Sequence, residues 1–217
     1  LDDVGGISPS GTYDFASTLD LGAVFSLDLV RHFKTEGFYP ADLFDSRTAN
    51  LDTWTDFDGT DANDVDAQLF VRTTQDDPSG SPTYSAFQNF TSGTFRARGF
   101  QFRTVLTSKD PAQDIRVFQL GYSAKFQRRV EQSSSVITSS GLTTVPFSAP
   151  FFVGTASLGG ANSNLPAVNI TAQNLASGDF FEVSNITASN FQIHFKNSSN
   201  ASISKQFTFT AVGFGKG

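Results

Sequence analysis

The sequence lacks several residues and patterns on which whole protein classes depend. It has no cysteine, which excludes a disulfide framework and any zinc site built on thiolates. No apolar run approaches the length of a transmembrane helix, and no polybasic segment is present for an anionic membrane. No extended stretch keeps the 3.6-residue apolar period of an amphipathic helix. These absences favour an all-β protein that inserts in no membrane and is assembled in a cytosol or a virus particle.

Positive charge is also scarce. Charged residues make up 17% of the 217 residues, and the formal net charge is -6. Because affinity for nucleic acid rests mainly on lysine and arginine at phosphates, we expect no nucleic-acid partner. The chain begins Leu-Asp-Asp-Val, without an initiator methionine or a signal-like segment, so we expect it to be one portion of a longer polypeptide.

Phenylalanine is the residue in excess: there are 24, against one tryptophan, four tyrosines and no methionine. These rings indicate a core of rigid apolar side chains that need no hydrogen-bond partner. Apolar and polar residues alternate over residues 190–196 and again over 206–211, with an Asn/Ser connection at 197–200. This period of two predicts a hairpin with one buried face.

Similar alternating runs, separated by turn residues, recur along the chain and predict antiparallel sheets. We expect an all-β fold of two jelly-roll-like antiparallel β-sandwich domains in tandem. We expect the first, over residues 1–130, to be a galactose-binding-like jelly roll that begins with a Gly/Ser/Pro-rich connection at 1–11. The second is a C-terminal sandwich over residues 131–217. The boundary is placed in the polar segment 128–135.

No catalytic set is evident. Nucleophilic catalysis needs a nucleophile beside a base, usually a histidine that a third group orients. The two histidines, His32 and His194, lie inside predicted strands, and no Gly-x-Ser-x-Gly motif surrounds any serine. We therefore expect no enzyme and no cofactor.

An aspartate-rich loop between Asp52 and Asp66 is the best metal candidate. Asp56, Asp58 and Asp61 offer spaced carboxylates of the kind that calcium binds, but the closing glutamate of an EF-hand is absent. A hydrated acidic loop is the alternative, and we assign no metal site.

The main basic run is Arg96, Arg98, Arg103 and Lys109. By strand alternation, Arg96 and Arg98 are expected on the same face as Phe100 and Phe102. This suggests guanidinium–ring stacking at a surface or subunit contact.

Several segments follow one another in an order that resembles the C-terminal region of tailed-bacteriophage tail-tip and tail-fibre proteins of the host-specificity class. The C-terminal ones are Gly-Asp-Phe-Phe-Glu-Val (178–183), Asn-Phe-Gln-Ile (190–193), Phe-Lys-Asn-Ser-Ser (195–199), Ser-Lys-Gln-Phe (204–207) and Gly-Phe-Gly-Lys (213–216). Upstream segments are 71–78, 84–87, 97–103 and 129–131. The resemblance covers residues 10–217.

This resemblance implies a non-enzymatic structural or receptor-binding module of a phage tail, located in the virion and involved in host attachment. It implies other tail proteins as partners, a homo-oligomer (a trimer by analogy) and a bacterial surface receptor or glycan. The receptor-binding residues stay unassigned; loop tips near Asp58, Ser79 and Asn197 are the default places for contact. The alternatives are a carbohydrate-binding appendage of a larger extracellular protein and a tail component without receptor contact.

Overall fold

The computed structural model describes residues 7–40, 48–54, 62–155 and 164–215, and within them the chain is built from β-strands. The prediction of an all-β fold is confirmed. A short 3-10 turn lies at Leu51–Thr53. No helix there has the length and hydropathy needed to cross a membrane.

The first unit is one six-stranded antiparallel sheet in the order β4-β3-β5-β2-β6, with β1 also paired to β5. The strands are β1 (Ser10–Asp14), β2 (Leu19–Phe38), β3 (Val65–Thr74), β4 (Gln88–Asn89), β5 (Gly93–Ser108) and β6 (Asp114–Phe126). Strand β5 lies at the centre: β3 pairs along one edge, and β2 followed by β1 along the other.

This sheet folds over on itself. Its 20-residue strand β2 pairs with β5 through its first half and with β6 through its second half. A register shift between Asp20 and Phe25, around Gly22 with a φ of 79°, bends the strand. As a result Tyr122 of β6 stacks on Phe102 of β5 at 4.1 Å, although these strands are not neighbours in the sheet. The strands of this unit therefore form one continuous sheet, and the two separate stacked sheets of the expected jelly roll are not confirmed.

The second unit contains two sheets. The strands are β7 (Arg128–Gln132), β8 (Val136–Ile137), β9 (Thr143–Pro146), β10 (Ala167–Gln173), β11 (Phe180–Ser184), β12 (Asn190–Lys196) and β13 (Gln206–Phe214). One sheet has the order β10-β13-β7 with β8 also on β13, and the other the order β11-β12-β9. Their apolar faces share one cluster, in which Phe195 of β12 meets Phe207 of β13 at 5.8 Å between ring centroids.

The predicted hairpin of residues 190–196 and 206–211 is wrong. Strand β12 pairs with β11 and β9, whereas β13 pairs with β10, β7 and β8. The turn begins as a hairpin, with Lys196 bridged to Ser202, but the chain then crosses to the facing sheet. Alternation identifies the buried face of each strand, and that part is correct. It cannot say whether two such faces lie side by side or opposite each other.

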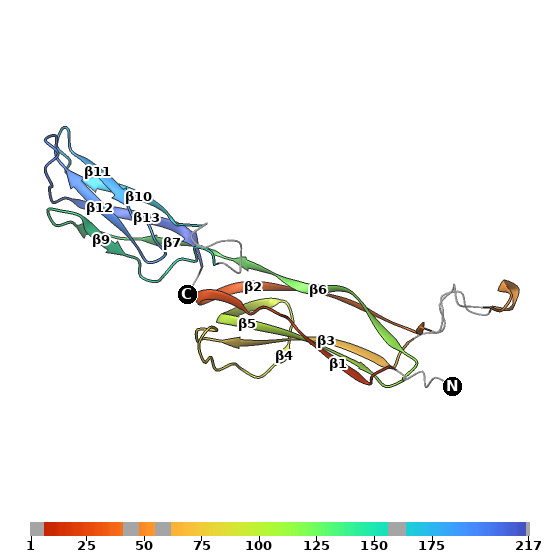
Figure 1. Cartoon of the computed structure of the whole chain (residues 1–217). Coiled ribbons are helices and arrows are strands. Elements are labelled where there is room, and N and C mark those ends of the chain that lie inside the picture. The colour runs from red at the N-terminus through yellow and green to blue at the C-terminus, as the bar shows by residue number, and fades with distance from the viewer. Residues whose placement is uncertain (1–6, 41–47, 55–61, 156–163, 216–217) are drawn as a thin grey trace.

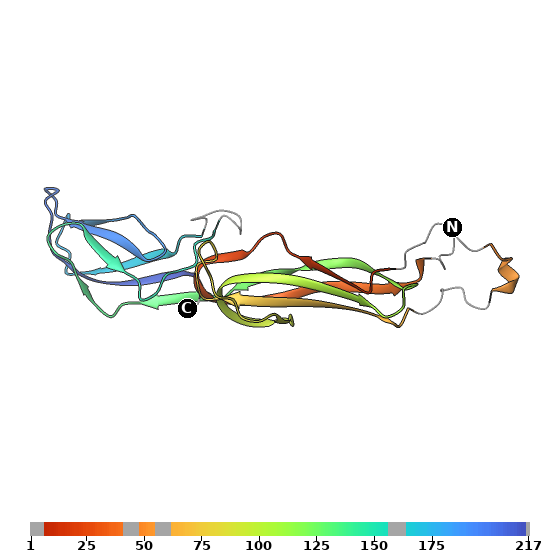
Figure 2. The ribbon, with the colours of Figure 1, turned by 60° about the horizontal axis from the view of Figure 1, so that its bottom comes forward.

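The two units lie end to end and give the molecule an elongated shape (Figure 1 and Figure 2). The change from one to the other falls at Gln127, between β6 and β7, while the sequence placed it between residues 130 and 131. Strand β7 pairs with β13 over its whole length, so residues 128–130 belong to the second unit.

Aromatic rings join the units. Phe151 and Phe152 are neighbours in an extended segment, and their side chains enter different cores: Phe151 the second, Phe152 the first. Phe152 stacks on Phe126 at 3.9 Å and meets Phe25 edge-on at 5.7 Å. Its backbone N–H donates to the carbonyl of Phe214. Because one segment serves both cores, the two units are held in a defined arrangement.

Candidate functional site

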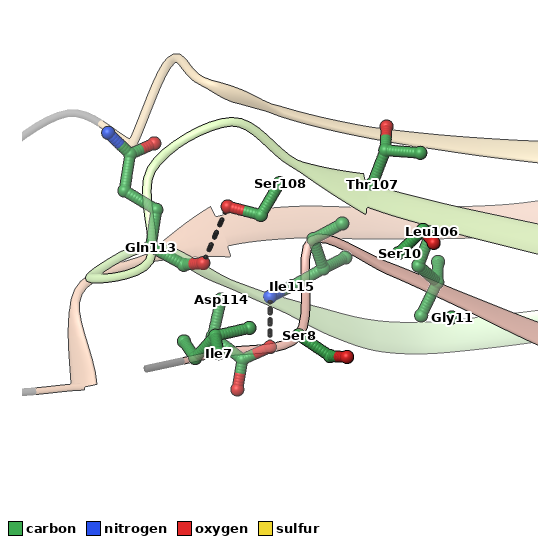
Figure 3. A pocket seen from close by; sticks show the side chains of 10 residues that line it. All are labelled: Ile7, Ser8, Ser10, Gly11, Leu106, Thr107, Ser108, Gln113, Asp114 and Ile115. Carbon is green, nitrogen blue, oxygen red and sulfur yellow. Dashed lines mark hydrogen bonds between the residues drawn. The ribbon is translucent and has the colours of Figure 1, made fainter. Parts of the chain in front are cut away.

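Two pockets on the first unit could hold a ligand, and they differ in chemistry. The first lies at the end of the unit that is remote from the junction, between β1, the end of β5 and the start of β6 (Figure 3). Its volume is about 190 Å³. Its lining is Ile7, Ser8, Ser10, Gly11, Leu106, Thr107, Ser108, Gln113, Asp114 and Ile115.

Several polar groups of this first pocket already bond within the protein. The Ser108 hydroxyl donates to the carbonyls of Asp110 and Gln113, and the Gln113 side chain donates to Tyr39 Oη at 2.7 Å. The side-chain amide oxygen of Gln113, Oε1, in turn accepts from the backbone N–H of Asp64. Figure 3 shows the bond from Ser108 to Gln113 and that from the Ile115 N–H to Asp114. With these bonds made, the pocket secures the β5–β6 turn and offers a ligand mainly apolar surface.

The second pocket, which we call the arginine pocket, is polar. It has a volume of about 220 Å³ and opens on the outer surface over β1, β3 and β5. Its lining is Asp14, Phe15, Arg72, Phe87, Gln101, Phe102 and Arg103. Strand pairing brings these side chains together: Arg72 of β3 lies opposite Gln101 of β5, and Arg103 of β5 lies opposite Asp14 of β1.

Arg72 is held in one orientation by its neighbours. Its Nε–H donates to Gln101 Oε1 at 2.8 Å, and the Gln101 amide donates onward to Thr18 Oγ1 at 2.9 Å. The guanidinium carbon lies 4.7 Å from the ring centroids of both Tyr84 and Phe87. No carboxylate within the described ranges forms an ion pair with Arg72, and no hydrogen bond there uses its two terminal nitrogens. The guanidinium is thus fixed while its outer N–H groups stay available.

Arg103 is neutralised by Asp14. Its Nε and one terminal nitrogen donate to the two carboxylate oxygens at 2.7 and 3.1 Å, and its guanidinium also lies 4.3 Å from the Phe87 centroid. The hydrogen bond from Arg103 holds the pKa of Asp14 below its usual range, and the charge of Arg72 adds to the effect. Asp14 raises the pKa of Arg103 in return. One paired and one unpaired guanidinium leave the pocket with a net positive charge.

A fixed guanidinium with free terminal N–H groups is suited to bind an oxyanion through two parallel hydrogen bonds. The remaining lone pairs of Asp14 can accept from hydroxyl groups. The groups that line the pocket are therefore suited to bind a polar anion.

The predicted basic run is dispersed by the structure. Arg98 pairs with Asp20 at 3.1 Å and with Asp77 at 2.8 Å, and these hydrogen bonds raise its pKa. Arg96 is exposed on β5, and Lys109 follows the end of that strand. The expected stacking of Arg96 and Arg98 on Phe100 and Phe102 is not found among the described contacts, because both rings face the core. Of the run, Arg103 alone enters the arginine pocket.

The two histidines lie in separate units. His32 on β2 bonds to the Ser123 hydroxyl at 3.0 Å, and His194 on β12 bonds to the Ser202 hydroxyl at 2.8 Å. Each is part of a cross-strand polar contact, and the fold does not bring them together.

The aspartate-rich loop is only partly described. Asp52 lies in the 3-10 turn, Asp64 directly precedes β3 and Asp66 is its second residue. Asp56, Asp58 and Asp61 fall outside the described residues. Within the described ranges, no group of three or more His, Cys, Asp or Glu side chains could hold a metal ion.

Two of the predicted loop tips are described. Ser79 lies in a turn where its N–H and hydroxyl both donate to Asp77, and Asn197 accepts from the N–H groups of Ser199 and Ala201. These side chains shape their own turns.

Sequence reasoning missed Arg72, Phe87 and Gln101 as site residues. Their separation along the chain gives no motif, since the contact depends on the register of β3 against β5. A usable signal was an arginine at a polar position of this alternating strand, followed by a Tyr-x-x-Phe segment.

No protein-family model, curated protein or solved structure matches this chain.

Proposed function

We propose that this chain is a non-enzymatic structural and receptor-binding module of a bacteriophage tail tip or tail fibre, located in the virion and acting in host attachment. The starting point is the ordered set of segments over residues 10–217 that resembles host-specificity proteins of tailed phages. The resemblance brings with it other tail proteins as partners and a homo-oligomer, a trimer by analogy.

The observation that carries the proposal is the aromatic junction. A module that holds a binding surface away from a particle needs length and stiffness. Here two all-β units lie end to end, and adjacent residues Phe151 and Phe152 are buried in different cores. The rings of Phe25 and Phe126 enclose Phe152 on the first unit. Such packing opposes the hinge motion that is the default between domains.

Adsorption to intact bacteria tests this function. The labelled chain is mixed with cells of a panel of strains, and bound label is measured with and without excess unlabelled chain. We expect saturable binding to a narrow set of strains. Adsorption to none, or equal adsorption to all, contradicts host recognition and leaves a tail component without receptor contact.

Light scattering tests the assembly. We expect the particle mass of an oligomer, an integral multiple above the single-chain mass of 23.4 kDa. A strict monomer at high concentration contradicts the oligomer.

A second candidate, a carbohydrate-binding appendage of a larger extracellular protein, is favoured by one observation: the arginine pocket has both a free guanidinium and a carboxylate acceptor. Binding of a soluble polysaccharide by a monomeric chain, without adsorption to whole cells, supports this candidate over the first.

A further inference from the structure

We infer that the arginine pocket binds the carboxylate of a sugar acid, a hydroxyl-bearing monoanion of the uronate type. This inference deepens the proposed function and rests on it only for the source of the ligand, a glycan of the bacterial surface. The binding itself depends on the pocket alone.

Charge and orientation select the anion. Arg72 keeps its terminal N–H groups available because Nε is used by Gln101, which is itself anchored on Thr18. Stacking on Tyr84 and Phe87 fixes the guanidinium plane. The Arg72 side chain is therefore already ordered before a ligand binds. Binding costs little side-chain entropy, which favours affinity. A carboxylate matches the two parallel donors of a guanidinium.

The neighbouring pair selects the rest of the ligand. Asp14 places a second, negative group in the same pocket, tied to Arg103. The free lone pairs of Asp14 accept hydrogen bonds from hydroxyls. The negative charge of its carboxylate repels a dianion such as phosphate. A ligand with one negative charge and several hydroxyls satisfies both ends of the pocket.

The size of the pocket agrees with a single sugar residue. At about 220 Å³ the pocket is smaller than the 300–1,000 Å³ typical of sites for drug-sized ligands. A longer glycan would extend over the surface, with one acidic residue held in the pocket.

Titration of the full chain with sodium glucuronate, observed by ¹⁵N NMR, tests the inference. The side-chain amide of Gln101 and the Nε–H of Arg72 report directly on the pocket. We expect saturable shifts of these signals with glucuronate, none with glucose, and a weaker response to inorganic phosphate. Shifts that fail to saturate, or phosphate binding as tight as glucuronate binding, overturn the inference.

Two variants and a control locate the site. Arg72→Gln is expected to weaken glucuronate binding about tenfold or more, since it removes a charge-assisted pair of hydrogen bonds. Arg72→Lys keeps the positive charge but loses the two parallel N–H donors of the guanidinium, and is expected to weaken binding as well. Arg116→Gln is the matched control, because Arg116 also stacks on rings, those of Phe38 and Phe118, outside the pocket. Equal binding by Arg72→Gln and Arg116→Gln overturns the assignment.

Cell adsorption separates this inference from the proposed function. A chain that adsorbs to cells but does not bind glucuronate contradicts the sugar-acid site and leaves the attachment function standing. A chain that binds glucuronate through Arg72 but adsorbs to no cell supports the site and contradicts the function.

Discussion

The two units use the same residue, phenylalanine, to build cores of different design. In the first unit a few long strands form one sheet, and the sheet bends until its own face closes on itself. In the second unit shorter strands form two sheets whose Phe-lined faces meet. Strand length and the bulge near Gly22 account for the difference, since a 20-residue strand can serve two neighbours in turn.

The comparison shows that ring content and alternation do not by themselves determine architecture. Phe102 in the first unit and Phe195 in the second are both buried strand residues. Phe102 contacts Tyr122 of its own sheet, whereas Phe195 contacts Phe207 of the facing sheet. What differs is the path of the chain between the strands.

The largest expected effect comes from removing the ring that the two units share. Phe152 is 6% exposed, and Phe152→Ala is expected to lower the free energy of unfolding by about 3–5 kcal/mol, because it leaves a cavity between Phe25 and Phe126. Urea denaturation measures the change. We also expect the transitions of the two units to separate, since the shared packing is gone.

Two further variants sharpen this result. Phe195→Ala removes a fully buried ring from the second unit alone, so its loss of stability should be confined to that unit. Phe118→Ala removes a ring that is 51% exposed on β6 and should change stability by at most about 0.5 kcal/mol. A Phe152→Ala chain as stable as Phe118→Ala would contradict the role of the junction.

A smaller loss is expected from Gly215→Ala, also at the junction. Gly215 has a φ of 88°, and a Cβ there would lie 2.8 Å from the Phe25 ring and 2.9 Å from Phe152 Cβ. Strain and the forced shift of these rings should cost about 1–3 kcal/mol, measured by thermal unfolding. Gly141→Ala, where nothing lies within 4 Å, is the control and should be nearly neutral. Equal melting temperatures for the two variants would contradict this packing.

The smallest effect is electrostatic and belongs to the second unit. Asp179 accepts from Lys205 Nζ at 2.7 Å and from the Ala176 N–H at 2.8 Å, at the crossing between the two sheets. These bonds lower the pKa of Asp179 below its usual 3.8. A lowered carboxyl pKa adds stability above the unfolded value, and this contribution is lost as pH falls through the folded value.

Asp179→Asn should therefore melt at a lower temperature than the natural chain at pH 7, and the difference should shrink below about pH 4. Melting temperature against pH measures this. Asp52→Asn, in the exposed 3-10 turn, serves as the control and should leave the curve unchanged. A difference that stays constant down to pH 2 would show that the Asp179 bonds do not depend on its charge.

Much of the fold was predictable because apolar alternation is local. It identified the buried faces of β12 and β13 and the all-β class. Strand partners were not predictable, because pairing depends on the route of the chain after Ser202 and not on the pattern within each strand. The single sheet of the first unit was missed for the same reason: β2 reads as shorter strands until its two sets of partners are known.

The candidate site was less predictable than the fold. Arg103 was singled out as part of a basic run, but its partner Asp14 lies far away in sequence and meets it through the β1–β5 register. Arg72 carries the available charge. Its importance follows from its lack of an ion-pair partner among the described residues, which no local pattern reveals.

The segment that holds Phe151 and Phe152 also has a mechanical consequence. This segment packs into both cores. A sideways force on the far turns of the second unit is therefore resisted by ring stacking and strand pairing, whereas a flexible linker would give way. We therefore expect the arginine pocket and those turns to keep a nearly constant separation. If several copies assemble as proposed, such a constant spacing would let weak contacts with a repetitive surface form together, with little orientational freedom left to lose.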